Sequence, residues 1–192
     1  MAFQAFLDTC VLYGATLCDV MLTVASFGAY EPHWSPDVIA ELERNLVEDA
    51  AVAPEAAAYR IAEMELAFPQ ASVTGYSDLM TTLTCHPKDR HVLAAAVLAR
   101  SEVLVTFNLN DFPEEALEPL GVRAVHPDDF LLDQLDLHPA LVGRALTSLV
   151  RRYTRPTVTL PSVLATQARA GVPVFAQEVR RHDFAATSED GT

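Results

Sequence analysis

Residues 86–113, HPKDRHVLAAAVLARSEVLVTFNLNDFP, predict a helix, a buried strand and a polar loop in immediate succession. Pro87 starts the helix, which runs through Arg100, because Pro suits the first turn and the apolar residues then recur at helical spacing. The apolar face comprises Val92, Leu93, Ala96 and Val97. Residues 102–106 are a short apolar strand, and FNLNDFP follows it as a loop. A helix that leads directly into an apolar strand is typical of a parallel sheet covered by helices.

The same pattern extends outward from this block in both directions. Residues 3–7 predict a buried strand and residues 11–27 a helix, while residues 71–74 and 122–125 predict two further strands. Ser35-Pro36-Asp37 is a helix start, with a capping Ser, a Pro in the first turn and an acid at the positive helix end. Additional helices are predicted at residues 36–49, 54–68, 139–153 and 161–170, with a short turn at 77–84 and a last helix through His182. The chain therefore predicts an α/β fold with a central parallel sheet.

The predicted organisation is one α/β domain at residues 1–135 and a helical C-terminal extension at residues 136–192 with a frayed end, ATSEDGT. A chain of 192 residues with 51% hydrophobic content is long enough to build such a core. Residues 11–27 are apolar, but Asp19 lies in their middle, which favours a buried helix over a membrane span. No signal peptide is apparent, and three cysteines without metal-ligand or disulfide spacing fit a reducing cytoplasm.

The net charge of −13 argues, as a bulk property, against a nucleic-acid partner. The charge is unevenly distributed, however. Residues 1–143 hold 6 Lys and Arg against 22 Asp and Glu, whereas residues 144–192 hold 7 Arg against 4 acids. These arginines, which include Arg151 and Arg152, form either a solvated helix face or a surface that contacts phosphates.

Four acidic positions fall on surfaces that otherwise look buried. Asp8 ends the first strand, Glu41 lies at the edge of an apolar helix stripe, and Asp89 projects near the middle of the apolar face of its helix. The fourth position is the loop at residues 106–111, which contains Asn108 and Asp111. Each acid alone is more simply explained as a helix cap or a solvated charge. Together they predict a shared site, because loops at the carboxyl ends of parallel strands meet at one rim.

Clustered carboxylates repel one another unless a hard divalent cation neutralises them, and Mg²⁺ and Mn²⁺ prefer oxygen ligands. Such an ion can activate water and hold a phosphodiester for in-line attack. His86 and His91 lie near this predicted site, and we interpret both as structural or surface histidines.

These motifs, FLDTCVL, SPDVIAELERNL and the block at residues 86–113, resemble PIN-domain ribonucleases, and especially the VapC-like toxins of bacterial toxin–antitoxin pairs. The resemblance covers residues 3–130 and leaves the C-terminal extension outside. It implies a three-layer α/β/α sandwich and an endoribonuclease that depends on Mg²⁺ or Mn²⁺. It also implies an RNA substrate, a cognate antitoxin protein, a homodimer and no membrane association.

By position, Asp8, Glu41 and Asp89 match the first three acids of that family. Asp111 is the nearest carboxylate to the fourth position, while Asn108 and Thr106 match supporting polar residues at the end of the second motif strand. The resemblance implies that Asp8 and Asp89 bind the principal metal directly. Glu41 and Asp111 then bind through water or recruit a second ion. RNA phosphates are expected at Lys88, Arg90, Arg151 and Arg152.

Cys10 departs from the family pattern, because many relatives carry Asn or Ser there and a thiol is a weaker donor. Two alternatives to the nuclease stay open. A PIN-like module could bind RNA or a protein without cleaving. A haloacid-dehalogenase-type phosphohydrolase also uses an Asp after a buried strand, but Cys10 stands where its second acid is expected.

Overall fold

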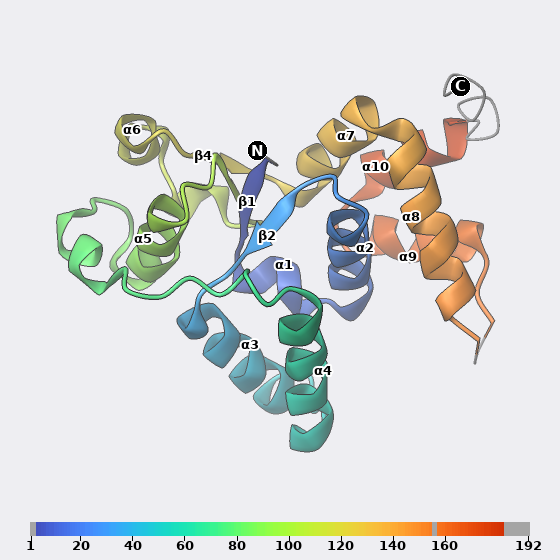
Figure 1. Cartoon of the computed structure of the whole chain (residues 1–192), viewed down its shortest axis with the longest axis horizontal. Coiled ribbons are helices and arrows are strands. Elements are labelled where there is room, and N and C mark those ends of the chain that lie inside the picture. Colours follow the sequence, from blue (N-terminus) through green and yellow to red (C-terminus); the bar gives the residue numbers. More distant parts are fainter. Residues whose placement is uncertain (1–2, 155–156, 183–192) are drawn as a thin grey trace. The chain divides into compact units, whose positions relative to one another are not determined.

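A four-stranded, entirely parallel sheet forms the centre of the computed structural model, which describes residues 3–154 and 157–182 (Figure 1). The strands, in the spatial order β2-β1-β3-β4, are β2 (Glu31–His33), β1 (Gln4–Leu7), β3 (Val103–Val105) and β4 (Arg123–Val125). In the register of the sheet, Phe6 lies between His33 and Leu104. All three residues of β3 are buried, as expected for a strand covered on both faces.

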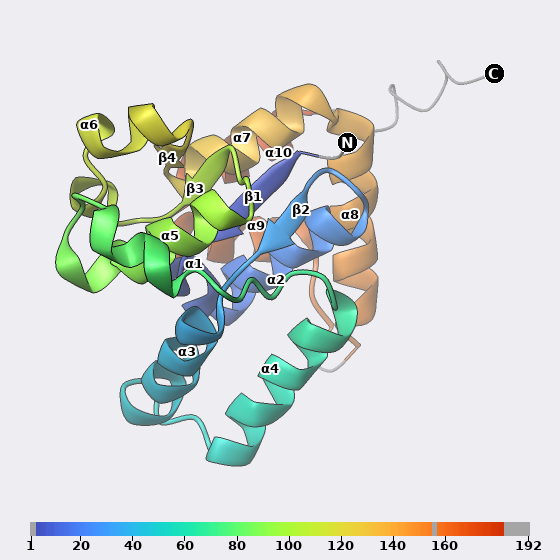
Figure 2. The same cartoon turned by 60° about the vertical axis from the view of Figure 1, so that its left-hand side comes forward.

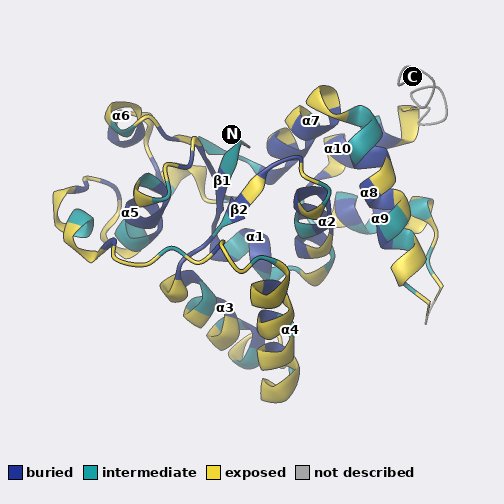
Figure 3. Ribbon diagram, viewed as in Figure 1, coloured by how far each residue is buried: buried dark blue, intermediate teal, exposed yellow. Residues whose placement is uncertain are grey.

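The helices of this part of the chain range from 4 to 14 residues, and one of them, the helix that begins at Arg90, directly follows a 3₁₀ turn. They are α1 (Thr9–Tyr13), α3 (Pro36–Glu48), α4 (Pro54–Ala67), α5 (Arg90–Leu98) and α6 (Glu114–Leu117), with 3₁₀ turns η1 (Ser77–Thr82), η2 (Pro87–Asp89), η3 (Leu109–Asp111) and η4 (Glu118–Leu120). The predicted start of α3 is confirmed: the Ser35 side chain accepts a hydrogen bond from the Val38 amide at 3.2 Å. Helices α3 and α4 pack as an antiparallel pair (Figure 2). Helix α4 buries only a narrow stripe and is otherwise exposed (Figure 3).

The chain divides into two compact units that are not consecutive in sequence. The first comprises Met1–Tyr13 and Glu31–Val125, and the second comprises Gly14–Tyr30 and His126–Thr192. The second unit is helical, with α2 (Ala15–Ser26), α7 (Pro127–Leu137), α8 (Pro139–Arg152), α9 (Leu160–Arg169) and α10 (Pro173–Arg181). The predicted α/β class with a central parallel sheet and a helical C-terminal part is confirmed. The predicted domain boundary after residue 135 falls in the last turn of α7 and stays a prediction.

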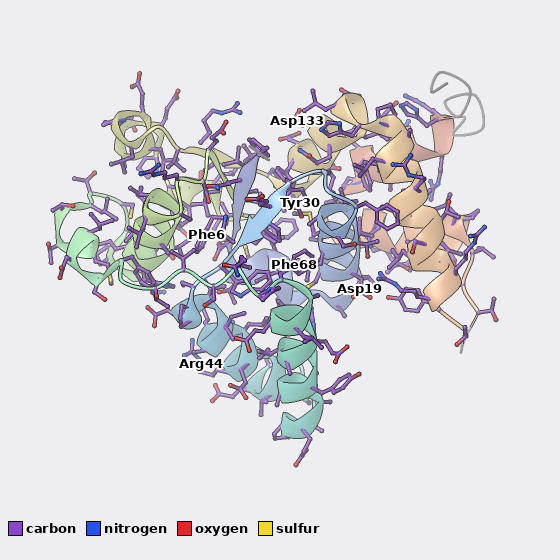
Figure 4. All side chains as sticks on the ribbon, viewed as in Figure 1. Phe6, Asp19, Tyr30, Arg44, Phe68 and Asp133 are labelled. Carbon is purple, nitrogen blue, oxygen red and sulfur yellow. The ribbon has the colours of Figure 1, made fainter. Side chains whose placement is uncertain are left out.

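Polar contacts connect α2 to the C-terminal helices within the second unit. The Arg152 guanidinium donates to the Thr23 hydroxyl, and the Tyr153 hydroxyl donates to the carboxylate of Asp19, which Figure 4 labels on α2. The Gln167 side-chain amide donates to the Thr16 carbonyl at 2.7 Å. An early segment of the chain thus forms part of the C-terminal helical unit.

The structure departs from the sequence prediction in four places. The helix predicted at residues 11–27 is broken at Gly14 into α1 and α2. Residues 71–74 form only an isolated bridge, between Ser72 and Trp34. Strand β2 was not predicted, because Glu-Pro-His has low β-propensity and is extended through its pairing with β1. Helix α7 was also omitted, although Pro127 at its first position and two acids in its first turn are start signals.

Within residues 3–154 and 157–182, no helix combines the length and the apolar character that crossing a membrane requires. None of the three cysteines, Cys10, Cys18 and Cys85, forms a disulfide bond within the described residues. The segment predicted as a frayed end, ATSEDGT, lies outside the described residues.

Candidate active site

Asp8 lies where β1 gives way to α1 without an intervening loop. Its amide donates to the Val105 carbonyl of β3 at 3.1 Å, so Asp8 continues the sheet pairing by one residue. Its own carbonyl accepts from the amides of Val11 and Leu12 at 3.0 and 3.3 Å, which opens the helix. The side chain is consequently fixed at the carboxyl edge of the two central strands, with only 7% of the residue exposed.

Three donors surround the Asp8 carboxylate. The Thr9 amide donates to Oδ1 at 2.7 Å, and the Thr106 hydroxyl donates to Oδ2 at 2.6 Å. The Cys10 thiol lies 3.2 Å from the same Oδ2. Burial raises the pKa of Asp8, the negative charge of Glu41 raises it further, and the three donors only partly offset this. The site therefore holds a carboxylate whose charge is incompletely compensated by the chain itself.

The Cys10 thiol links the two strand ends. Its sulfur accepts a hydrogen bond from the Phe107 amide at 3.3 Å and lies 3.5 Å from the Thr106 hydroxyl. Burial, followed by the charge of Asp8, raises the pKa of the Cys10 thiol to about 12. The group therefore stays protonated at neutral pH, and its proton is available for the Asp8 carboxylate.

Glu41 is attached to this network through Thr9. The Thr9 hydroxyl, buried at the start of α1, donates to Glu41 Oε2 at 2.9 Å. Glu41 itself is half-buried at the edge of the apolar stripe of α3, as its position in the sequence predicted. Thr9, the residue after Asp8, thus orients Glu41, an acid on a helix more than thirty residues further along the chain.

Asp89 lies at the end of η2 and precedes the first residue of α5. Its side chain is 25% exposed, so Asp89 borders the core at the start of this helix. Burial raises the pKa of Asp89, and the charges of Asp111 and Asp8 raise it further, against the effect of His86 and His91. His86 Nδ1 lies 3.4 Å from Asp89 Oδ2. Asp8 and Asp111 are therefore both close enough to raise the pKa of Asp89.

Two hollows in the first unit contain the four acids. The smaller, of about 370 Å³, is lined by Asp8, Thr9, Cys10 and Tyr13, among others. The larger, of about 780 Å³, is lined by Asp111 together with residues of α3 and η2. Glu41, Asp89 and Asn108 line both hollows, which therefore adjoin. The residues predicted from sequence come from four separate elements and surround one continuous depression.

The depression suits a hard divalent cation, because carboxylate, amide and hydroxyl oxygens line it together with two histidines, a thiol and two basic side chains. Among residues 3–154 and 157–182, however, no three His, Cys, Asp or Glu side chains are close enough together to hold one ion. Mg²⁺ commonly binds through one or two carboxylates and keeps several waters, so the residues present fit such an ion without a tighter cluster. That the four acids bind a metal ion stays a prediction.

Comparison with known proteins matches this chain in two adjacent parts. The family model of the PIN domain matches residues 4–110, which contain Asp8, Glu41 and Asp89, and ends one residue before Asp111. The chain belongs to the PIN-domain family. A second family model, the VapC50 C-terminal domain, matches residues 127–181 of the helical unit.

A curated relative of this PIN-domain chain is "Putative ribonuclease VapC50" of Mycobacterium tuberculosis (strain ATCC 25618 / H37Rv). The two are 49% identical over 107 residues, which cover 56% of this chain and 63% of the relative. The match therefore spans less than two thirds of the relative's length. No solved structure matches the chain significantly.

The supporting residues of the PIN domain differ in how the structure uses them. Thr106, fully buried, bridges Asp8 to the loop after β3, because its hydroxyl also accepts from the Asn108 amide at 3.0 Å. Among the cations predicted to contact RNA, Lys88 lines the larger hollow and Arg90 is half-buried beside it in sequence. Arg152 is bound to Thr23, and Arg151 is exposed on the helical unit.

Sequence reasoning missed two kinds of site residue. Thr9 was not proposed, because its link to Glu41 depends on how α1 lies against α3, which no local pattern records. Asp37 and Arg44 were also overlooked, although a signal existed. They are four residues before and three residues after Glu41, and such spacing places residues on one helix face.

Proposed function

We propose that this chain is an endoribonuclease dependent on Mg²⁺ or Mn²⁺ and acts as the toxin of a type II toxin–antitoxin pair. The observation that carries the proposal is the depression in which Asp8, Glu41, Asp89 and Asp111 meet, because the first three of these acids lie inside the part of the chain that matches the PIN domain. The name of the curated relative, a ribonuclease, supports the same class of activity.

In the proposed reaction, Asp8 and Asp89 bind the principal ion directly, and Glu41 and Asp111 bind through water or recruit a second ion. The cation would activate a water and neutralise charge on the scissile phosphate, which leaves a 5′-phosphate and a 3′-hydroxyl. The chain supplies orientation: Thr9, Cys10 and Thr106 fix the Asp8 carboxylate, and the Thr9 hydroxyl fixes Glu41. Fixed ligands reduce the rearrangement that metal binding requires.

The proposal includes partners of stated chemistry. An antitoxin protein would block the acidic depression with an Arg or Lys side chain that takes the place of the cation, and the toxin would act in the cytoplasm as a homodimer. The arginines of the helical unit would widen the surface for RNA or antitoxin. Arg151, which is exposed, is the clearest candidate for that role.

The decisive test is cleavage of RNA by the purified full chain with Mg²⁺ or Mn²⁺, compared with Asp8→Ala and Asp89→Ala. Asp78→Ala is the matched control, since Asp78 is an exposed acid on η1 of the same unit. We expect metal-dependent cleavage by the wild type and the control, and none by the two site variants. An absence of cleavage on any RNA would contradict the proposal, and RNA binding without cleavage would support a non-cleaving module.

The contribution of the helical unit to RNA or antitoxin binding is best tested by neutralising single charges. Removing residues 140–192 would also remove Leu146 and Leu149, which are buried in α8, the helix that packs on α2. Arg151→Gln keeps that core, and we expect it to weaken RNA or antitoxin binding. Unchanged affinity for both would remove the arginine surface from the proposal while leaving the active site untouched.

A further inference from the structure

The larger hollow contains two positively charged side chains in addition to its acids. Arg44, which Figure 4 labels on α3, and Lys88 of η2 both line it. Each is exposed, and among residues 3–154 and 157–182 neither has a carboxylate within ion-pair distance. Four acids line the same hollow, namely Asp37, Glu41, Asp89 and Asp111. Two of these acids accept hydroxyl hydrogen bonds instead, Asp37 from Tyr76 and Glu41 from Thr9, so neither Arg44 nor Lys88 acts as a local charge partner of the hollow's acids.

Cations are scarce in this part of the molecule. Residues 1–143 hold only 6 Lys and Arg against 22 Asp and Glu, and two of the six line the larger hollow. Arg60, by contrast, is used structurally, because its guanidinium donates to the carbonyls of Leu12 and Tyr13 at the end of α1. Without a bound cation, the hollow carries an excess of two negative charges and would repel a phosphate. With a divalent ion among the acids, Arg44 and Lys88 remain as donors without anionic partners.

We propose that Arg44 and Lys88 bind phosphates of the RNA strand that flank the phosphate to be cleaved. The inference rests on the proposed ribonuclease function and specifies where its substrate lies. The strand would pass from the smaller hollow at Asp8 into the larger one, between α3 and η2. Arg44 can engage a phosphate with two parallel N–H donors, whereas Lys88 acts as a point charge. Neither residue touches the reacting atoms, so both position the substrate.

The kinetic test uses Arg44→Gln and Lys88→Gln in the full chain, with Arg100→Gln as the matched control. Arg100 is an exposed arginine of the same unit that lines neither hollow. We expect kcat/KM for RNA cleavage to fall roughly three- to tenfold in each site variant, through a higher KM at nearly unchanged kcat. The slope of log(kcat/KM) against log[salt] should become shallower by about 0.7 for each lost phosphate contact. The control should change neither quantity.

A binding test separates this inference from the proposed activity. The same substitutions, with Asp8 unchanged, are titrated with a fluorescent single-stranded RNA in the presence of Ca²⁺, which also binds oxygen ligands and replaces Mg²⁺ so that binding is measured apart from cleavage. Reduced affinity and a shallower salt slope for the Gln variants, but not for Arg100→Gln, would support the inference even if the wild type cleaves no RNA. Cleavage by the wild type with unchanged KM, affinity and salt slope in both variants would overturn it and leave the ribonuclease proposal standing. A wild type that neither cleaves nor binds RNA would overturn both.

Discussion

Asp8 and Asp128 are two aspartates with the same exposed fraction, 7%, in the two units of the molecule. Asp128 accepts the backbone amides of Val174 and Phe175 at 3.0 and 2.8 Å, one on each carboxylate oxygen, at the start of α10. Asp8 accepts one backbone amide, one hydroxyl and one thiol, and it shares its hollow with Glu41. Because the two residues are equally buried, their environments differ in the donors and charges that surround each carboxylate.

The two environments lead to opposite expectations. Asp128 faces the amide groups at the N-terminus of a helix, where the helix dipole favours negative charge. Asp8 faces other acids, and its pKa is raised by burial and by Glu41. We therefore expect Asp128 to stabilise the fold. Asp8, whose pKa is raised, is instead typical of a carboxylate that serves a function, such as binding a cation.

Asp8→Asn is the strongest test of the contrast between Asp8 and Asp128. This change preserves the size of the side chain and removes the charge, so we expect RNA cleavage to fall at least about 100-fold, since loss of even an outer-shell partner of a metal ligand costs 10–100-fold. Cleavage assays under Mg²⁺ or Mn²⁺ measure the loss. Activity within a few-fold of the wild type would remove Asp8 from the proposed metal site.

Stability should not follow activity in this variant. Because folding raises the pKa of Asp8, the folded chain binds more protons, and stability falls as pH rises through that range. At neutral pH the ionised carboxylate therefore costs stability. In Asp8→Asn, the removal of this charge offsets the weaker acceptance of hydrogen bonds by the amide. Without divalent ions, we therefore expect the unfolding free energy to fall by no more than about 1 kcal/mol. Adding Mn²⁺ should raise the melting temperature of the wild type only, which differential scanning fluorimetry can follow.

Asp128→Ala should show the reverse pattern. Two amides at the start of α10, that of Phe175 buried and that of Val174 partly buried, lose their acceptor, and we expect the unfolding free energy to decrease by about 2 kcal/mol. Denaturant unfolding measures the change, and hydrogen exchange at Val174 and Phe175 localises it. Asp129→Ala is the matched control, because Asp129 is the exposed neighbour in the same helical turn. Equal effects of the two substitutions would show that the capping contact contributes little.

These two residues also mark how far the sequence leads. The acid at the end of a buried strand is readable, because strand ends in a parallel sheet share a rim, and Asp8 was predicted in this way. Glu41 and Asp89 were predicted instead from their positions relative to apolar helix faces. The role of Asp128 was not predicted, because its partners lie forty-six and forty-seven residues away and depend on how α7 packs on α10. Strand β2 was hidden for the same reason: its pairing with β1, and not its Glu-Pro-His sequence, makes it extended.

Thr106→Val tests whether the donors around Asp8 matter for function. The substitution keeps a β-branched shape in a fully buried position but removes the hydroxyl that donates to Asp8 and accepts from the Asn108 amide. We expect cleavage to fall about tenfold, as for other residues that orient a metal ligand. Thr106→Ser should restore most of the activity, and an equal loss in Thr106→Ser would instead indicate a packing defect.

The smallest expected effect concerns Cys10, whose thiol is a weaker hydrogen-bond donor than a hydroxyl or an amide. The sulfur nevertheless contacts Asp8 Oδ2 and accepts from the Phe107 amide, and a thiol with a pKa of about 12 keeps its proton. Cys10→Ala removes both contacts, and we expect cleavage to fall two- to fivefold, roughly the effect of one ordinary hydrogen bond.

Cys10→Ser is the informative partner of that change, because a hydroxyl donates to a carboxylate more strongly than a thiol does. We expect Cys10→Ser to cleave RNA at least as fast as the wild type, in the same assays. If Cys10→Ala instead matched the wild type, the amide of Thr9 and the hydroxyl of Thr106 would suffice to orient Asp8. The carboxylate would then be positioned by two donors, and Cys10 would contribute only to the contact between α1 and the loop after β3.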